Sequence, residues 1–497
     1  MLKNSLRPYV LLIAGVDSGG GAGITADCLT VFDTGSWPLP CVSALTAQSL
    51  LQVASVEAVN EEIFKKTMDT AISDWDRPSA IKIGVITSQK ILSLLLDYLE
   101  GPLQGIPVVW DPVLCATAGG MDSADLQKDL ERILKVSTVF TPNLPEALAL
   151  TQSSSEDSIY SVASKLKDKG AVAVIVKGGH NDKATYAVDT LITPTLKTTL
   201  THKKVLGNGV HGGGCALSSA IASFLAQRFA IEDAIVLASA YVYRGIKAPA
   251  LDTNTVRPPC GHHGIDFTLA DMPEVTEEGF PQEGGPFAPC PMKLGLYPVV
   301  DSPEWIERLL KLGVKTIQLR IKDKEDPKLY DKIVKAVALA SEYKARLFID
   351  DHYELAIKAK AYGVHLGMED LREADICKIK EAGLRLGVST HGAYELLKAL
   401  QLKPSYIALG HIFPTQSKQM PSKPQGVNKL ALEQRLVNDL MPTVAIGGIK
   451  LYNVQDVLAT GVGSVALITG ITKASDPDAE CKVWLDICGS GDEEDAH

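Results

Sequence analysis

The sequence lacks the features that mark several classes of protein. No stretch of its 497 residues approaches the roughly 18–20 apolar residues of a membrane-spanning helix, so we expect no membrane association. No block of Lys and Arg is present and the net charge is −10, which argues against a nucleic-acid partner, because phosphate backbones favour clustered positive charge. The nine cysteines form neither CxxC pairs nor a regular framework, which fits reduced thiols in the cytoplasm.

The composition that is present is typical of a soluble globular protein, with 46% hydrophobic and 22% charged residues. The chain is longer than the roughly 100–200 residues of a usual domain, so we expect more than one. Residues 269–292 are rich in Pro, Gly and acidic residues, and we interpret them as a linker between domains at 1–268 and 293–497. The apolar run near the N-terminus continues into a glycine loop, which favours a first strand over a signal peptide.

The first domain alternates strand-like and helix-like segments, which predicts a doubly wound α/β sheet with small antiparallel additions between residues 184 and 205. It contains two glycine-rich loops, GVDSGGGAG and HGGGC, each followed by a helical pattern. Such a loop at a helix N-terminus presents backbone N–H groups to an anion. Two of them suggest a phosphate donor and a small acceptor in one crevice.

The second domain has eight strand candidates separated by helical segments, which predicts a small TIM (β/α)8 barrel. Cations, carboxylates, hydroxyls and glycines follow these strands, where barrel enzymes place their chemistry. Asp351 and Asp370 are oxygen ligands suited to Mg²⁺, and Arg320, Lys322 and Lys418 would balance phosphate charge. The glycines after the last two strands match the usual barrel site for a phosphate monoester.

Five segments of the second domain, spread over residues 293–475, together resemble thiamine phosphate synthase: QLRIK, HLGMED, GVSTH, GHIFPTQSKQMPS and AIGGI. The resemblance implies that the barrel joins a pyrimidine diphosphate to a thiazole phosphate, with Arg320 and Lys418 as catalytic residues. It also implies the binding residues: Gln318, Arg320, Lys322, Asp350, Ser389 and Lys418 for the diphosphate, Asp351 and Asp370 for Mg²⁺, and Thr415, Ser417, Gly448, Ile468 and Thr469 for the thiazole phosphate.

Seven segments over residues 8–265 resemble hydroxymethylpyrimidine/phosphomethylpyrimidine kinase of the ribokinase group: VDSGGGAGITAD, ALTAQ, KIGVI, DPV, TPNLPEA, VKGGH and HGGGC. This resemblance implies phosphorylation of 4-amino-5-hydroxymethyl-2-methylpyrimidine and of its monophosphate by ATP. Cys215 would handle the acceptor proton, with its thiolate favoured by the helix N-terminus; the alternative is a small buried hydrophobic residue. The expected binding residues are Asp27 and Gln48 for the pyrimidine, and Asn143, Glu146, Lys177, Gly212, Gly213 and Gly214 for ATP and Mg²⁺.

The sequence departs from these families at three positions. Gly213 stands where Thr is usual, Asp350 where Asn is common, and Met368 where Gln is common. The glycine preserves the backbone cradle, so we expect weakened rather than lost kinase activity. Asp350 either joins the metal or lowers the affinity for the diphosphate by repulsion. We interpret two histidines as structural: His211 in the HGGGC loop and His365 in the core of the barrel.

On these resemblances the chain is a bifunctional transferase of thiamine biosynthesis that acts on small molecules. Two alternatives stay open: the first domain is a pyridoxal-type kinase, or one domain is kept as a non-catalytic ligand-binding module. The sequence leaves the oligomeric state open, a homo-oligomer included.

Overall fold

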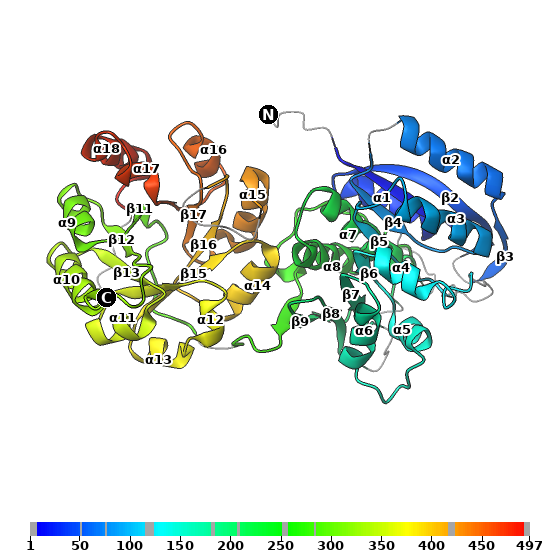
Figure 1. Cartoon of the computed structure of the whole chain (residues 1–497), viewed down its shortest axis with the longest axis horizontal. Coiled ribbons are helices and arrows are strands. Elements are labelled where there is room, and N and C mark those ends of the chain that lie inside the picture. Colours follow the sequence, from blue (N-terminus) through cyan, green and yellow to red (C-terminus); the bar gives the residue numbers. More distant parts are fainter. Residues whose placement is uncertain are drawn as a thin grey trace. The chain divides into compact units, whose positions relative to one another are not determined.

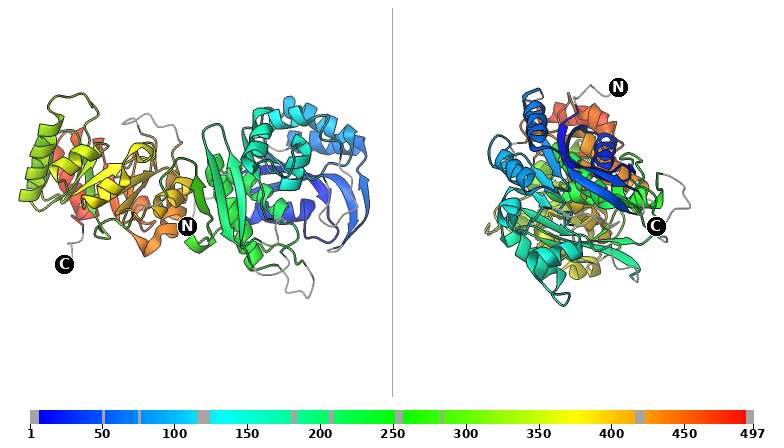
Figure 2. Two further views of the ribbon diagram at one scale, coloured as in Figure 1. Left: turned by 90° about the horizontal axis from the view of Figure 1, so that it is seen from below. Right: turned by 90° about the vertical axis from the view of Figure 1, so that its right-hand side faces the viewer.

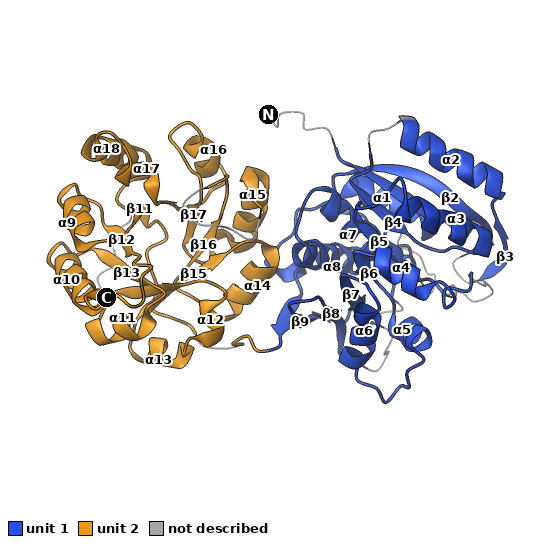
Figure 3. Cartoon of the chain, viewed as in Figure 1, with its two compact units in different colours: residues 1–278 blue, residues 279–497 orange. Residues whose placement is uncertain are grey.

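The computed structural model describes residues 7–49, 52–74, 77–114, 124–179, 184–205, 209–250, 257–282, 285–415 and 423–491. The chain forms two compact units, Met1–Glu278 and Gly279–His497 (Figure 3). Each unit is built from strands that alternate with helices (Figure 1). In the described part of the chain, no helix is long and apolar enough to cross a membrane.

The first unit is organised around one ten-stranded sheet. Across the sheet the strands are β10 (Glu274–Glu277), β9 (Lys197–Lys203), β8 (Tyr186–Ile192), β7 (Ala173–Val176), β6 (Val139–Phe140), β5 (Val108–Trp110), β4 (Ala80–Ile83), β1 (Tyr9–Val16), β2 (Trp37–Gln48) and β3 (Val53–Ala58). The strands from β7 to β2 run parallel, whereas β3 and β8 to β10 pair antiparallel with their neighbours. The expected antiparallel strands after the parallel core are therefore confirmed, whereas the hairpin of β2 and β3 was not predicted.

Helices cover both faces of this sheet (Figure 2). They are α1 (Gly23–Asp33), α2 (Glu61–Asp74), α3 (Gln89–Glu100), α4 (Leu130–Val136), α5 (Leu144–Thr151), α6 (Ile159–Asp168), α7 (Gly213–Ala226), α8 (Ile231–Lys247) and the 3₁₀ turn η1 (Leu269–Asp271). Helices α1, α7 and α8 pack together, and α2 to α6 form the other layer. Strand β1 is buried by both layers: Leu11 and Ile13 join the core under α2 to α6, and the alternate residues Val10 and Leu12 are also buried.

The second unit is a closed barrel of eight parallel strands, as the sequence predicts. The strands are β11 (Gly295–Val300), β12 (Thr316–Leu319), β13 (Arg346–Asp350), β14 (Gly363–Leu366), β15 (Arg385–Thr390), β16 (Tyr406–Gly410), β17 (Thr443–Ile446) and β18 (Ser464–Leu467). Pairing of β11 with β18, from Gly295 opposite Ser464, closes the ring. Closure leaves no strand edge exposed and gathers all carboxyl ends at one mouth.

Helices surround the barrel between successive strands (Figure 1). They are α9 (Pro303–Lys311), α10 (Leu329–Glu342), α11 (Tyr353–Ala359), α12 (Asp370–Glu373), α13 (Ile376–Glu381), α14 (Ala393–Gln401), α15 (Gly426–Val437), η2 (Asn438–Leu440), α16 (Val454–Leu458), α17 (Thr469–Thr472) and α18 (Pro477–Cys488). Helix α9 shows why they form: Ile306, Leu309 and Leu310 recur at helical spacing and are buried, while Glu307 and Lys311 pair on the solvent face.

The stretch 269–292 is not a free linker along its whole length. Residues 269–277 belong to the first unit, where β10 pairs with β9 and Asp271 lies 2.6 Å from Nζ of Lys247. Residues 285–290 lie against the barrel: Lys380 donates to the Gly285 carbonyl, and Cys290 is buried. Composition alone does not reveal this, because the partners of both parts lie far away in the sequence.

We predict that the boundary between Glu278 and Gly279 separates two independently folding parts. Fragments 1–278 and 279–497 should each unfold cooperatively and keep their own activity. A barrel fragment that begins at 293 should melt roughly 5–10 °C lower, because it loses the burial of Phe280, Phe287 and Cys290. Calorimetric scans of the three fragments check this, and failure of both longer fragments to fold would contradict the boundary.

Candidate active sites

In the first unit, the two glycine-rich loops meet at the carboxyl end of the parallel strands. The first loop leads from β1 into α1, and the second leads into α7, whose N-cap Gly212 has φ +81°. A Cβ atom at Gly212 would lie 1.8 Å from the carbonyl oxygen of Gly21, so only glycine permits this approach. At Gly213 a Cβ would make an ordinary contact 3.4 Å from Val210, so the threonine usual there would fit. Two helix N-termini thus lie together, which favours an anionic ligand.

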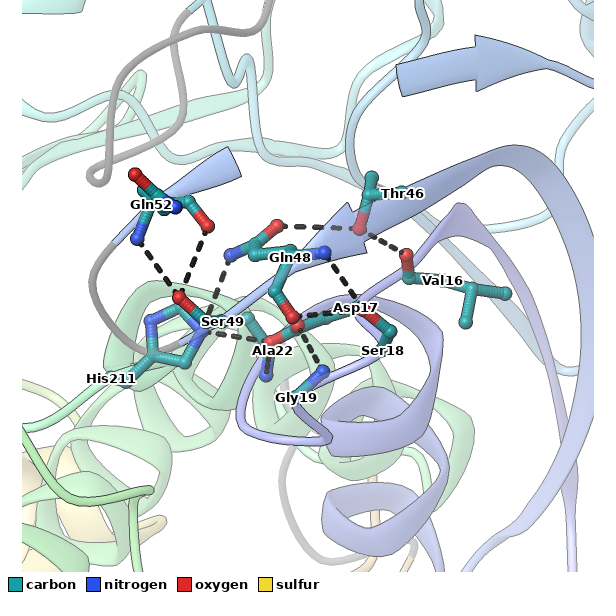
Figure 4. Close-up of polar contacts among 10 residues, drawn as sticks. All are labelled: Val16, Asp17, Ser18, Gly19, Ala22, Thr46, Gln48, Ser49, Gln52 and His211. Carbon is teal, nitrogen blue, oxygen red and sulfur yellow. Dashed lines mark hydrogen bonds and ion pairs between the residues drawn. The ribbon is translucent and has the colours of Figure 1, made fainter. Parts of the chain in front are cut away.

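Asp17 and His211 tie the two loops to each other (Figure 4). The carboxylate of Asp17 accepts hydrogen bonds from the backbone N–H groups of Gly19 and Ala22 and lies 2.8 Å from Nε2 of His211. Although burial opposes its charge, the hydrogen bond from His211 and these backbone donors lower the pKa of Asp17. His211 therefore does more than shape its own loop, because it joins the second loop to the first.

Gln48, the predicted pyrimidine ligand, lies at the end of β2 beside this pair (Figure 4). The Ser18 hydroxyl donates to the Gln48 carbonyl at 2.8 Å and accepts from the Gln48 N–H at 2.7 Å. The side-chain Nε2 of Gln48 lies 3.5 Å from Nε2 of His211. The structure thus brings this amide, which is partly exposed, to the edge of the glycine loops.

Asp27, the other predicted pyrimidine ligand, does not lie at this edge. Its side chain is completely buried, with its two oxygens 2.6 Å from Nζ of Lys82 and 2.7 Å from Oγ of Ser219. Both carboxylate oxygens already have partners within the protein, and the expected contact with a pyrimidine stays a prediction. The ion pair joins α1 to β4, and Ser219 joins it to α7. Asp27 and Lys82 therefore hold the two helices that begin at the glycine loops.

The predicted nucleotide residues gather at the ends of β6 and β7. Asn143 and Glu146 form a capping box at the start of α5, in which each side chain accepts from the backbone N–H of the other. Nζ of Lys177 lies 2.7 Å from Oδ1 of Asp111, and a Cβ on Gly214 would lie 3.4 Å from that nitrogen. Burial raises the pKa of Glu146 to about 7, and Lys177 opposes this rise. Asp111 also belongs to this cluster, although the sequence analysis includes it only as part of the DPV segment and not as a site residue.

Cys215 follows Gly214 in the first turn of α7. Burial raises the pKa of its thiol to about 11; the charge of Lys82 opposes the rise, and the carboxylates of Asp27 and Asp111 add to it. The surroundings of Cys215 in this structure therefore oppose the thiolate that the helix N-terminus would favour. Its role in handling the acceptor proton stays a prediction.

In the second unit, a cavity lies at the carboxyl ends of the barrel strands. Its lining includes predicted site residues that come from six different strand ends: Gln318, Arg320, Asp350, Asp351, Asp370, Ser389, Thr415 and Ile468. It also includes Tyr297, His365, His391, Tyr406 and His411. His391 and His411 directly follow β15 and β16, at the rim where the sequence places the site. Tyr297, His365 and Tyr406 were not predicted as site residues, because an aromatic or histidine side chain inside a strand has the pattern of core packing.

Asp350 lies between two predicted diphosphate ligands. Its Oδ2 is 2.7 Å from Nε of Arg320, and its Oδ1 accepts from the side-chain amide of Gln318. The sequence predicts that this carboxylate joins the metal or repels the diphosphate. In the structure it instead pairs with Arg320 and orients Gln318, so it acts on the diphosphate site through its neighbours. The ion pair uses one of the five N–H donors of the guanidinium group.

Asp351 and Asp370 lie side by side at the same rim. Burial, and next the negative charge of Asp370, raises the pKa of Asp351, and the two carboxyl groups are in hydrogen-bonding contact. Asp351 has φ +62°, a left-handed backbone that is uncommon outside glycine. Two carboxylates held together in this way fit a divalent cation, whose charge would offset their repulsion.

The other predicted residues of the barrel lie around the cavity or outside the description. Lys322 is on the exposed loop after β12. Gly448 has φ +66° and packs under the backbone of Pro414, and Thr469 begins α17. Ser417 and Lys418 lie outside the described residues, so their predicted roles stay predictions.

The chain thus carries two sites, each at the carboxyl ends of parallel strands. One combines helix N-termini with a lysine and carboxylates, and the other combines an arginine with paired carboxylates in a barrel. These features define two enzymes that act on small phosphorylated molecules. Comparison with protein families agrees: residues 17–260 match the model for phosphomethylpyrimidine kinase, and residues 296–471 match that for thiamine monophosphate synthase.

Individual relatives are similar to the second unit over nearly their whole length. Thiamine-phosphate synthase of Klebsiella pneumoniae subsp. pneumoniae is 58% identical over 208 residues, which cover 42% of this chain and 98% of that protein. The enzyme of Salmonella schwarzengrund is 59% identical over 207 residues, with the same coverage of 42% and 98%. The chain belongs to the thiamine-phosphate synthase family.

Two solved structures are similar to the first unit. Pyridoxal kinase from Staphylococcus aureus in complex with pyridoxal is 28% identical, with a TM-score of 0.48, over 55% of this chain and 99% of that structure. Phosphomethylpyrimidine kinase from Clostridium difficile 630 is 31% identical, with a TM-score of 0.42, over 48% of this chain and 100% of that structure.

The family matches and the two topologies confirm the fold class expected from the sequence, a ribokinase-like α/β domain followed by a TIM barrel. They also confirm the expected function class. The chain is a bifunctional transferase of thiamine biosynthesis, with a phosphomethylpyrimidine kinase domain and a thiamine-phosphate synthase domain.

We predict that Cys215 acts as a hydrogen-bonding thiol rather than as a base. Cys215→Ala should lower the kinase kcat by about 10-fold, the worth of one hydrogen bond, and Cys215→Ser by no more than about 3-fold. With a pKa of about 11, the thiol should give no rise in kcat between about pH 7 and pH 9. Cys377→Ala, at an exposed cysteine of the other unit, is the matched control. A loss of about 10²–10⁴-fold in both Cys215 variants would instead assign general-base catalysis to the thiolate.

Proposed function

We propose that the first unit transfers a phosphate from ATP, with Mg²⁺, to 4-amino-5-hydroxymethyl-2-methylpyrimidine and then to the resulting monophosphate. The second unit joins the diphosphate so formed to thiazole phosphate, and releases thiamine phosphate and pyrophosphate. The observation that carries this proposal is the barrel cavity, where Arg320 meets the paired carboxylates of Asp351 and Asp370. A cation and a metal-binding pair at one rim suit a diphosphate that leaves during the reaction.

The kinase site supports phosphoryl transfer by positioning. This reaction needs its donor and acceptor in line and the phosphate charge neutralised. The N–H groups of Gly213 and Gly214 at the start of α7 would cradle the phosphates, and Lys177 would supply a positive charge that Asp111 already holds in place. Gln48 would bind the pyrimidine at the edge of the loops, and the Cys215 thiol would orient the acceptor hydroxyl.

The carboxylates beside Lys177 are suited to the metal of the kinase. Glu146 has a pKa raised to about 7, so an approaching cation would favour its ionised form. Asn143 fixes the position of Glu146 through the capping box. When bound, Mg²⁺ would neutralise charge on the transferred phosphate. We assign these two residues to organising the nucleotide and its metal.

The synthase site supports departure of a diphosphate from the pyrimidine. The carbon–oxygen bond breaks with its electron pair going to pyrophosphate, and the thiazole nitrogen forms the new carbon–nitrogen bond. The aminopyrimidine ring stabilises the developing cation. Arg320 and Gln318, both oriented by Asp350, face the oxygens where negative charge accumulates, so they stabilise the transition state more than the ground state.

Mg²⁺ in the synthase would be held by Asp351 and Asp370. Among the described residues no group of three or more His, Cys, Asp and Glu forms a ready-made metal site, so phosphate oxygens of the substrate would complete the coordination. We assign Lys418 to the leaving diphosphate together with Lys322. The thiazole phosphate is assigned to the opposite rim, with these proposed ligands: Thr415, Ser417, Gly448, Ile468 and Thr469.

We predict that Arg320→Lys lowers the synthase kcat by about 10-fold or more, which corresponds to about 1.4 kcal/mol at the transition state. Lysine keeps the charge but loses both the fork that matches a diphosphate and the Nε contact with Asp350. Steady-state assays of both activities check this, with Arg308→Lys on the surface of α9 as the control. The kinase activity of the same molecule should be unaffected.

Two results would count against this account of Arg320. Unchanged synthase kinetics in Arg320→Lys would remove the residue from the site. An equal loss of both activities would show general damage to the protein, and Asp350→Asn would then provide the second variant. It removes the charge that orients Arg320 and Gln318, so it should lower the synthase kcat and leave the kinase activity unaffected.

A further inference from the structure

A line of hydrogen bonds crosses the inside of the barrel and ends at the cavity. The hydroxyls of Tyr297 on β11 and Tyr406 on β16 lie 2.7 Å apart. The Tyr406 hydroxyl is also 2.7 Å from Nδ1 of His365 on β14, and Nε2 of His365 is 2.7 Å from Oγ of Ser389 on β15. We call these four residues the buried relay. Because Ser389 is one of the diphosphate ligands that the sequence resemblance implies, the inference below rests on the proposed function.

The inner end of the buried relay has almost no solvent-exposed surface. Tyr406 is 0% exposed and Tyr297 is 1% exposed, and burial raises the pKa of both phenols well above the ordinary value, so both keep their protons. Phe348 packs against the Tyr406 ring with centroids 5.0 Å apart. A Cβ on Gly387 would lie 2.5 Å from the Tyr406 oxygen, so glycine there leaves the space that this hydroxyl fills. Packing therefore fixes the central hydroxyl of the relay.

The protons of the relay can point in two directions. Each hydroxyl carries one proton and a neutral imidazole carries one, so each bond has a single donor. If Nδ1 of His365 carries the proton, Nδ1 donates a hydrogen bond to Tyr406. Nε2 must then accept a hydrogen bond from the Ser389 hydroxyl. If Nε2 carries the proton, Tyr406 donates to Nδ1 and Nε2 donates to Ser389. Only in this second direction is the proton of Ser389 left for a ligand in the cavity.

Burial of the inner end selects between these directions. Within the described part of the chain, Tyr406 is the only hydrogen-bonding partner of the Tyr297 hydroxyl. In the first direction Tyr406 donates to Tyr297, which leaves the nearly buried proton of Tyr297 without an acceptor among the described residues, an arrangement that folded proteins avoid. In the second direction Tyr297 donates to Tyr406, and every inner proton has an acceptor. The geometry thus favours the Nε2–H form of His365.

We propose that Tyr297, Tyr406 and His365 are positioning residues that hold His365 with its proton on Nε2 and thereby present Ser389 to the diphosphate as a hydrogen-bond donor. Diphosphate oxygens only accept hydrogen bonds. A serine that donates its hydrogen bond to His365 would therefore turn only lone pairs toward the diphosphate oxygens. The buried relay sets the donor before the substrate arrives, which lowers the cost of reorganisation on binding.

The tautomer of His365 can be measured directly in the full chain. After labelling with ¹⁵N-histidine, long-range proton–nitrogen correlation spectra distinguish a protonated ring nitrogen from a bare one, and His365→Asn identifies the signals. We expect Nε2 protonated and Nδ1 bare. In Tyr406→Phe, which keeps the ring but removes the donor to Nδ1, we expect a mixture of the two tautomers. Protonated Nδ1 in the wild type, or an unaltered tautomer in Tyr406→Phe, would overturn the proposal.

Binding of inorganic pyrophosphate with Mg²⁺, measured by calorimetry, tests the consequence for Ser389. Ser389→Ala should weaken binding by about 10-fold, as expected for a hydrogen bond to a charged group, and Tyr406→Phe by about 3- to 10-fold. The double variant should bind no more weakly than Ser389→Ala, because the relay acts through Ser389 alone. A further loss on adding Tyr406→Phe to Ser389→Ala would show a general packing effect and contradict the proposal.

The remaining outcomes separate the relay from the proposed function. Tyr297→Phe removes only the hydroxyl farthest from Ser389, so Tyr406 still donates to Nδ1 of His365. Pyrophosphate binding should therefore weaken less than in Tyr406→Phe. If Tyr406→Phe disturbs folding, seen as a lowered melting temperature, the wild-type tautomer still decides the proposal. If Ser389→Ala leaves pyrophosphate binding unchanged while Nε2 is protonated, the proposal falls because the diphosphate assignment of Ser389 is wrong, not because the relay is.

Discussion

Parallel strands place all their carboxyl ends at one edge of a sheet, and both active sites of this enzyme depend on that constraint. In the first unit Asp17, Asp111 and Lys177 follow β1, β5 and β7, although 160 residues of sequence separate the first from the last. In the barrel the same rule brings Arg320 and Asp351 to one rim. The groups of both candidate sites are therefore positioned by the ends of the strands.

Three of the described cations in or beside these sites are paired with carboxylates in the structure. Lys177 is held by Asp111, Arg320 by Asp350, and the buried Lys82 by Asp27. Such pairs neutralise charge that would otherwise be buried alone, and they fix long side chains in one orientation. The consequence is that an incoming phosphate shares a preset cation rather than ordering a mobile one. In the barrel the buried relay extends this principle to the neutral donor Ser389.

The sequence predicts the barrel and most of its site, because eight short apolar strands end in polar residues at regular spacing. The sequence does not show what depends on burial. Asp27 has the residue type of a pyrimidine ligand, yet only the fold shows it sealed against Lys82. Cys215 follows a helix N-terminus that would favour a thiolate, but desolvation raises its pKa to about 11. His365 has the pattern of a core residue, and its link to Ser389 depends on neighbouring strands that no local pattern reveals.

The central claim is that one chain carries out two consecutive reactions, and a time course with the full wild-type protein tests it most directly. The protein is given the aminopyrimidine alcohol, ATP, Mg²⁺ and thiazole phosphate, with pyridoxal as a competing acceptor. The account predicts that thiamine phosphate forms, and that the pyrimidine diphosphate accumulates when thiazole phosphate is left out. Phosphorylation of pyridoxal in preference to the aminopyrimidine, or a diphosphate that accumulates without conversion to thiamine phosphate, would contradict it.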